Sequence, residues 1–148
     1  MAYTKALYEI VGECRKSKNV KIKAQILKDH ESTQLIDMLQ LTYNPSIQWL
    51  LPEGNPPYTP AEGIDEEGTG SDLEGALFGK MRMMKYFISV DGNILEDVNP
   101  AKREVVFVRL LETIAPKDAK LVLEMKTRSI KGVSSNVVQK AFPQITVS

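Results

Sequence analysis

Cysteine and histidine are almost missing from this chain, and their scarcity removes several kinds of chemistry. Cys14 is the only cysteine and His30 the only histidine among 148 residues. A single cysteine excludes an internal disulfide and a cysteine-rich zinc site. A single histidine argues against a histidine-based metal centre and against a Ser-His-Asp triad. We therefore expect Cys14 to be a small core residue and His30 to be a capping or surface residue.

Motifs for nucleotide or metal binding are also absent. The chain contains no Gly-x-x-x-x-Gly-Lys followed by Ser or Thr, and no Gly-x-Gly-x-x-Gly. An acidic cluster at Glu62, Asp65, Glu66 and Glu67 lacks the spacing of a calcium-binding loop, so it predicts a solvated loop. The sequence thus predicts a protein that is not an enzyme, with no catalytic residue, no metal site and no cofactor.

Long hydrophobic runs are lacking as well. The longest apolar segments, such as residues 47–51, are far too short to span a bilayer. The first residues, Met1 to Lys5, carry no apolar signal segment. A content of 43% hydrophobic and 26% charged residues is typical of a soluble globular protein. We expect one domain over residues 1–148, a cytoplasmic location and no membrane partner; the oligomeric state stays open.

What the chain does have is helical periodicity over most of its length. Apolar residues recur at positions three and four apart, while capping residues and prolines mark where helices begin and end. The fold class predicted is all-α, an irregular bundle of six to eight helices. The first predicted helix starts near Thr4, the second runs over about residues 20–29, and the third starts at Glu31 or Ser32. The next starts at Ser71 or Asp72 and reaches Phe87. One helix follows Asn99-Pro100, another starts at Pro116, and the last runs from about Ser134 to Phe142.

A long loop rich in proline, glycine and acidic residues interrupts this pattern at about residues 52–70. Four prolines alternate with four glycines there, which excludes regular structure. The only tryptophan, Trp49, precedes the loop, and Tyr58 lies within it. We expect these two aromatic side chains to pin the loop to the core rather than to stack on a nucleic-acid base.

Charge is distributed unevenly although the formal net charge is zero. Seven lysines and arginines lie between Lys5 and His30, against three acidic residues. Seven acidic residues and no basic one lie between Glu53 and Glu74, and six basic residues lie from Lys117 onward. Both ends are therefore basic, and a basic face can form despite the neutral total.

A glycine followed by two serines in the basic C-terminal part indicates a phosphate-binding turn. The backbone N–H groups in the first turn of a helix lack partners within the helix and can bind an anion. An ordinary helix cap is the alternative interpretation. The candidate contacts with a DNA backbone are Lys16, Lys18, Lys21, Lys23, Arg128, Lys131, Gly132, Ser134, Ser135 and Lys140.

The order of these segments resembles the N-terminal helical DNA-binding domain of ATP-dependent DNA ligases from large tailed phages. The resemblance is carried in spaced fragments over nearly the whole chain. It implies that the glycine-containing turn and the helix after it lie near the minor groove and contact phosphates. The matching segments are Leu7-Tyr8-Glu9-Ile10, Lys23-Ala24-Gln25-Ile26-Leu27-Lys28, residues 35–43, Ile47-Gln48-Trp49, residues 73–87, Gly132-Val133-Ser134 and residues 138–145.

The chain departs from a ligase where catalysis would begin. A ligase needs Lys-x-Asp-Gly to carry the adenylate, and the only Asp-Gly here, Asp91-Gly92, has no lysine in place. The resemblance implies a stand-alone phage protein with the binding module and without the catalytic core, acting in the host cytoplasm.

Two hypotheses follow from the sequence. The first is a non-catalytic, largely sequence-independent protein that binds duplex or nicked duplex DNA. The second is a protein-interaction module on the same scaffold, which binds a replication, repair or host protein through residues 49–70 and no DNA. The DNA hypothesis requires that the basic segment 16–23 and the turn at Gly132 share one face.

Overall fold

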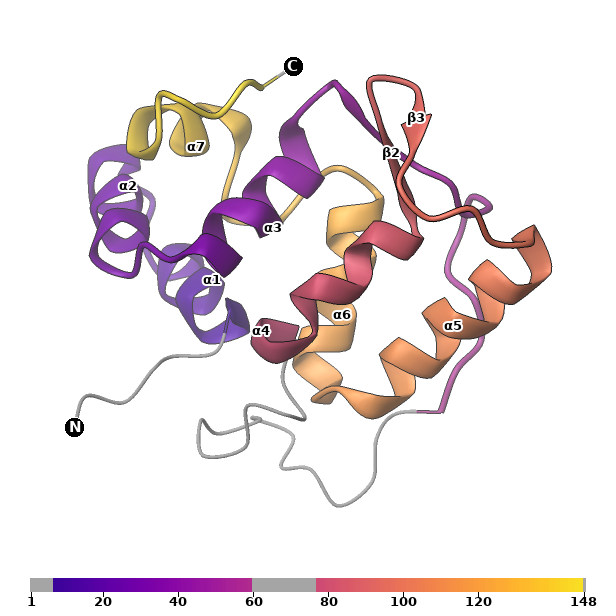
Figure 1. Ribbon diagram of the computed structural model, residues 1–148. Helices are drawn as coiled ribbons and strands as arrows, with labels where there is room; N and C mark the ends of the chain where they lie inside the picture. The colour runs from indigo at the N-terminus through magenta and orange to yellow at the C-terminus, as the bar shows by residue number, and fades with distance from the viewer. Residues whose placement is uncertain (1–6, 60–76, 148) are drawn as a thin grey trace.

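The chain is mostly helical, with a small three-stranded sheet beside the helices (Figure 1). The computed structural model describes residues 7–59 and 77–147. The predicted cap at Thr4, the predicted helix start at Ser71 or Asp72 and loop residues 60–70 lie outside these ranges. No helix in the described ranges is long and apolar enough to cross a membrane.

Three helices form the first third of the fold, as predicted. They are α1 (Leu7–Arg15), α2 (Val20–Asp29) and α3 (Thr33–Tyr43). The Asn19 side chain accepts hydrogen bonds from the N–H groups of Lys21 and Ile22, and the Ser32 hydroxyl accepts one from Leu35. These oxygens satisfy N–H groups that a helix leaves unpaired in its first turn. Ser32 is one of the two predicted starts of α3, whereas the cap at Asn19 was not predicted.

The later helices also begin at the predicted residues. They are α5 (Pro100–Thr113), α6 (Pro116–Lys126) and α7 (Ser135–Ala141). The Asn99 side chain caps α5 by accepting from the N–H of Ala101. Pro100 and Pro116 each occupy the start of a helix, where a missing N–H costs nothing.

The segment before α5 differs from its prediction. In place of one helix reaching Phe87, the structure has the short α4 (Leu77–Lys80) followed by the 3-10 helix η2 (Met81–Tyr86). Residues three apart lie on the same face of either helix type, so the spacing of the apolar residues does not distinguish them.

The small sheet corrects the prediction of an all-α protein. Strands β1 (Ile47–Trp49), β2 (Ile88–Val90) and β3 (Asn93–Ile94) pair antiparallel in the order β1-β2-β3. Asp91 and Gly92 form the turn between β2 and β3 with φ of 52° and 82°, as a two-residue hairpin requires. Strands of two or three residues are too short to show an alternating pattern, so only this turn could be predicted.

Side chains from nearly every element meet in one hydrophobic core. The rings of Phe87 and Phe107 pack edge to face with centroids 5.2 Å apart. Cys14 is fully buried, and burial raises the pKa of its thiol to about 11, so the expectation of a core cysteine is confirmed. The Trp49 indole donates to the Leu41 carbonyl at 3.0 Å, and Tyr58 packs against the core, which confirms their pinning role.

His30 occupies the C-cap position of α2, as expected. Its backbone N–H donates to the carbonyls of Leu27 and Lys28. Its ring nitrogen Nε2 lies 3.7 Å from the Glu13 carboxylate on α1. His30 therefore closes one helix and lies beside the next.

A buried carboxylate ties α4 to α6. Asp118, in the first turn of α6, has no exposed surface and accepts a hydrogen bond from the N–H of Leu77 at 3.0 Å. Burial raises the pKa of Asp118 to about 6, although the backbone N–H groups of Leu77 and Tyr8 act to lower it. The charged form is thus tolerated at neutral pH only at a cost in free energy.

We predict that Asp118→Asn flattens the pH dependence of stability. The pKa of about 6 in the folded protein lies above the ordinary aspartate pKa of 3.8, so the folded state holds this proton more tightly than the unfolded state. The free energy of unfolding of the wild type should therefore fall between about pH 4 and pH 7 by roughly 2 to 3 kcal/mol relative to the variant. Urea unfolding across this range measures it, with Asp97→Asn, at an exposed position before α5, as the control. Parallel profiles for the wild type and Asp118→Asn would contradict the prediction.

Candidate nucleic-acid interface

Residues 127–134 form the turn that brings the C-terminal helix back to the N-terminal helices. After α6, Arg128 and Gly132 take positive φ values of 67° and 91°. Ile130 and Val133 form an isolated antiparallel bridge, with the Val133 N–H donating to the Ile130 carbonyl at 3.0 Å. The chain thereby reverses direction, and α7 packs along α2 (Figure 1).

The Tyr43 hydroxyl holds this turn against the end of α3. It donates to the Val133 carbonyl and accepts from the Ile130 N–H at 3.0 Å. Tyr43 is buried, and burial raises the pKa of its phenol, so the hydroxyl stays protonated and able to donate. The two residues of the bridge are therefore fixed through a single side chain.

Arg128 holds the turn from its other end. Its guanidinium donates to the carbonyls of Ile47 at 2.7 Å and Asn44 at 2.6 Å, with Leu41 at 3.4 Å. A cation at the C-terminal end of α3 satisfies carbonyls that the helix leaves unpaired and complements the helix dipole. The structure gives Arg128 a role inside the fold, in contrast to the phosphate contact that the sequence indicated.

Gly132 permits a close approach between the turn and α1. A Cβ at this position would lie 2.4 Å from Cγ of Arg15 and 3.2 Å from its Cα. Arg15 Nε donates to the Lys131 carbonyl at 2.7 Å, and Arg15 Nη2 lies 2.7 and 2.9 Å from the two carboxylate oxygens of Glu124. Glu124 also accepts from the Lys131 N–H at 3.0 Å. Glycine is needed here for packing against Arg15, whatever else the turn binds.

Ser134 serves as the cap of α7. Its hydroxyl accepts from the Val137 N–H at 3.4 Å, and its carbonyl accepts from the Val138 N–H at 3.0 Å. The alternative of an ordinary helix cap is therefore confirmed. The cap engages one N–H of the first turn of a helix only seven residues long, so an anion nest gains no support from this geometry.

The two basic segments do meet beside this turn. Lys23 of α2 and Lys131 of the turn line one hollow of about 440 Å³, together with Tyr43, Ser134 and Ser135. Lys131 is exposed and Lys23 half-buried. The sharing of one face that the DNA hypothesis requires is thus present for this pair.

The remaining candidate lysines lie on or beside α1, α2 and α7, outside the lining of this hollow. Lys18, just before the cap of α2, and Lys21, in its first turn, are exposed, and so is Lys140 on α7, which packs against α2. Lys16, at the end of α1, lines a second hollow of about 580 Å³ between α1 and α6.

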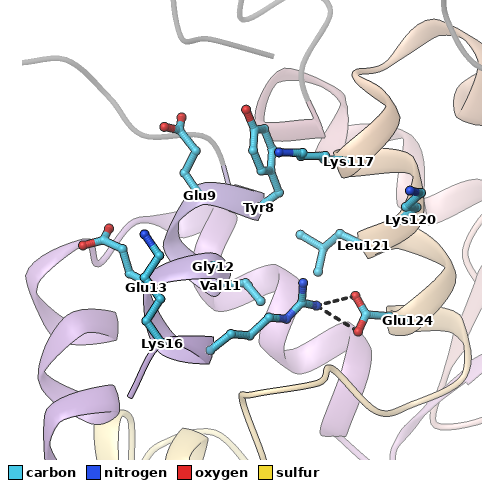
Figure 2. A pocket seen from close by; sticks show the side chains of 11 residues that line it. Tyr8, Glu9, Val11, Gly12, Glu13, Lys16, Lys117, Lys120, Leu121 and Glu124 are labelled. Atoms are coloured by element: carbon cyan, nitrogen blue, oxygen red, sulfur yellow. Dashed lines mark hydrogen bonds and ion pairs between the residues drawn. The ribbon is translucent and has the colours of Figure 1, made fainter. Parts of the chain in front are cut away.

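This second hollow brings in two lysines that the sequence did not single out (Figure 2). Lys117 and Lys120 of α6 face Lys16 across it, and Lys117 Nζ lies 5.7 Å from the centre of the Tyr8 ring. The pair of Arg15 and Glu124 forms part of its wall and connects it to the turn at Lys131. The i, i+3 spacing of the two lysines was the only signal in the sequence, and it is common on solvated helices.

We predict that Gly132→Ala destabilises the protein more than Gly54→Ala. Both glycines have positive φ, 91° and 86°, but only a Cβ at 132 meets another atom within 4 Å. The backbone strain common to both should cost about 1 to 2 kcal/mol, and the contact with Arg15 should add at least about 1 kcal/mol for Gly132→Ala. Urea unfolding measures both changes. Equal losses in the free energy of unfolding would contradict the prediction, because they would show that a Cβ at position 132 does not clash with Arg15.

The sequence comparisons identify a family but no characterised relative. No curated protein and no solved structure matches the chain. Residues 10–132 match the model of a family described as "Family of unknown function (DUF6433)". The match spans most of the chain, from Ile10 within α1 through α6 and the turn as far as Gly132. The chain therefore belongs to the DUF6433 family.

Proposed function

We propose that this protein is a non-catalytic, largely sequence-independent DNA-binding protein that contacts the backbone of duplex or nicked duplex DNA. The observation that carries the proposal is the hollow in which Lys23 and Lys131, from opposite ends of the chain, lie together beside Ser135. Two cations and a hydroxyl group at one place match the chemistry of a phosphate group.

The structure also narrows the set of contacts that we propose. Lys16, Lys18, Lys21, Lys131 and Lys140 are exposed, and Lys23 reaches the hollow, so their ammonium groups are available to phosphates. Flexible lysines that contact phosphates position DNA without reading its sequence. We assign Arg128, Gly132 and Ser134 instead to the stability of the turn that carries this surface.

The proposal agrees with the resemblance of the sequence to the N-terminal DNA-binding domain of phage ATP-dependent ligases. On this proposal the protein acts in the cytoplasm of a host cell. The closing segment of the resemblance, from Gly132 through α7, is part of the proposed face.

We predict that Lys23→Gln combined with Lys131→Gln weakens DNA binding and lowers its dependence on salt. Each lysine that neutralises a phosphate contributes about one unit to the slope of log K against log salt, so the slope should fall by about two. Fluorescence anisotropy with a nicked duplex, starting at about 50 mM salt, measures both quantities.

The matched control is Lys102→Gln combined with Arg109→Gln, which removes the same charge from exposed positions on α5. This control should bind DNA like the wild type. A wild-type protein that fails to bind any duplex at low salt would overturn the proposal, as would equal losses in the two double variants.

A second candidate function is a protein-interaction module that uses residues 49–70. One observation favours it: the proline-rich part of this segment is fixed on the protein surface. Lys126 Nζ donates to the Gly54 carbonyl at 2.8 Å, and the Thr59 N–H donates to the Glu112 carboxylate at 2.8 Å. Such a preformed surface reduces the entropy lost on binding. Shortening the segment would then abolish partner binding and leave DNA binding unchanged.

A further inference from the structure

A groove between η2 and α5 has a different chemical character from the basic face, which is the surface around the hollow lined by Lys23 and Lys131. It has a volume of about 390 Å³, and its two walls come from η2 with the end of α4 and from α5. None of α1, α2, α7 or residues 127–134 lines it. A ligand in this groove would therefore contact none of the proposed DNA-binding residues.

Helix geometry aligns the side chains of both walls. In a 3-10 helix, residues three apart eclipse one another, so Met83 and Tyr86 form a row that Lys80 extends at the preceding turn. On α5, Lys102, Val106 and Arg109 follow the i, i+4, i+7 spacing of one face. Each wall thus presents apolar side chains with a cation at one or both ends.

The floor of the groove is apolar and its rim is cationic. Met83, Val98 and Val106 are half-buried, and Leu110 below them is buried. No acidic side chain of residues 7–59 or 77–147 lines the groove. Neither Lys80 nor Lys102 nor Arg109 forms an ion pair with any residue in the described ranges, whereas the neighbouring Lys85 lies 3.3 Å from the Glu96 carboxylate.

We propose that this groove binds a short acidic peptide segment of a partner protein that carries one apolar anchor side chain. Lys102 and Arg109 lie about 10 Å apart along the axis of α5, since each helical residue rises about 1.5 Å. Side chains alternate between the two faces of an extended peptide, so positions i, i+2 and i+4 share one face, with the outer two about 13 Å apart. Carboxylates at the outer positions would reach the long, flexible side chains of Lys102 and Arg109 while an apolar side chain at the middle position enters the floor.

The groove is less suited to a nucleic acid than to such a peptide. Proteins that bind single strands stack bases on aromatic side chains. Tyr86 is the one aromatic residue among the described residues that line the groove, and Lys85 Nζ already lies 5.6 Å from the centre of its ring. The other side chains of the floor are aliphatic or methionine, which accept leucine, phenylalanine or tryptophan anchors.

The test uses the whole protein and labelled peptides of about eight residues, in which glutamates flank a leucine, phenylalanine or tryptophan. Fluorescence anisotropy should detect binding of at least one of these peptides. Replacing its apolar anchor by serine, or its glutamates by glutamines, should each weaken binding by about tenfold or more. A failure of all three peptides to bind better than the serine peptide overturns the proposal.

Protein variants locate the binding. Lys102→Glu combined with Arg109→Glu should abolish peptide binding, while Lys117→Glu combined with Lys120→Glu makes the same charge change on α6, outside the groove, and should preserve it. Far-ultraviolet circular dichroism checks that both variants fold, and Lys102→Arg should retain binding. Equal effects of the two charge reversals would overturn the proposal, as would a single-stranded oligonucleotide that binds with the same dependence on Lys102 and Arg109.

Discussion

The attachment of residues 127–134 to α1 and α3 is the constraint on which the rest of the structure depends. Three side chains make it: Tyr43 and Arg128 bind the turn to the end of α3, and Arg15 binds it to α1. The Arg15 and Arg128 contacts are charge-assisted, and those of Arg128 and Tyr43 satisfy backbone groups that would otherwise be left without partners. Because the turn is fixed in this way, α7 packs on α2, and the two basic ends of the chain lie on one face.

The sequence predicted those helices that begin with a capping side chain. Ser32, Asn99 and Ser134 each cap the helix that they were expected to begin, because the side-chain oxygen and the unpaired N–H groups are local neighbours. The sheet could not be predicted in this way. Its pairing of residues 47–49 with residues 88–90 depends on contacts distant in sequence, and strands this short show no period.

The candidate site shows a similar division. The sequence indicated that DNA binding requires the two basic segments to share one face, but it could not show that they do. Only the fold shows that Lys23 lies beside Lys131 of the turn. Arg128 looked like a phosphate ligand because basic residues near a glycine have that chemistry in many proteins. Its position beside three carbonyls of residues 41, 44 and 47 is decided by tertiary packing, which leaves no mark in the local sequence. A positive charge in a sequence therefore does not reveal whether it faces solvent or the backbone.

The basic face and the η2–α5 groove carry the same sign of charge but differ in what lies between their cations. Lys23 and Lys131 flank hydroxyl and backbone groups, which suit a hydrated phosphate. Lys102 and Arg109 flank Val106, which suits a ligand that also buries an apolar side chain. None of the elements that line one surface lines the other. The two proposals together therefore describe a protein that binds DNA through one surface and an acidic segment of a partner protein through the other.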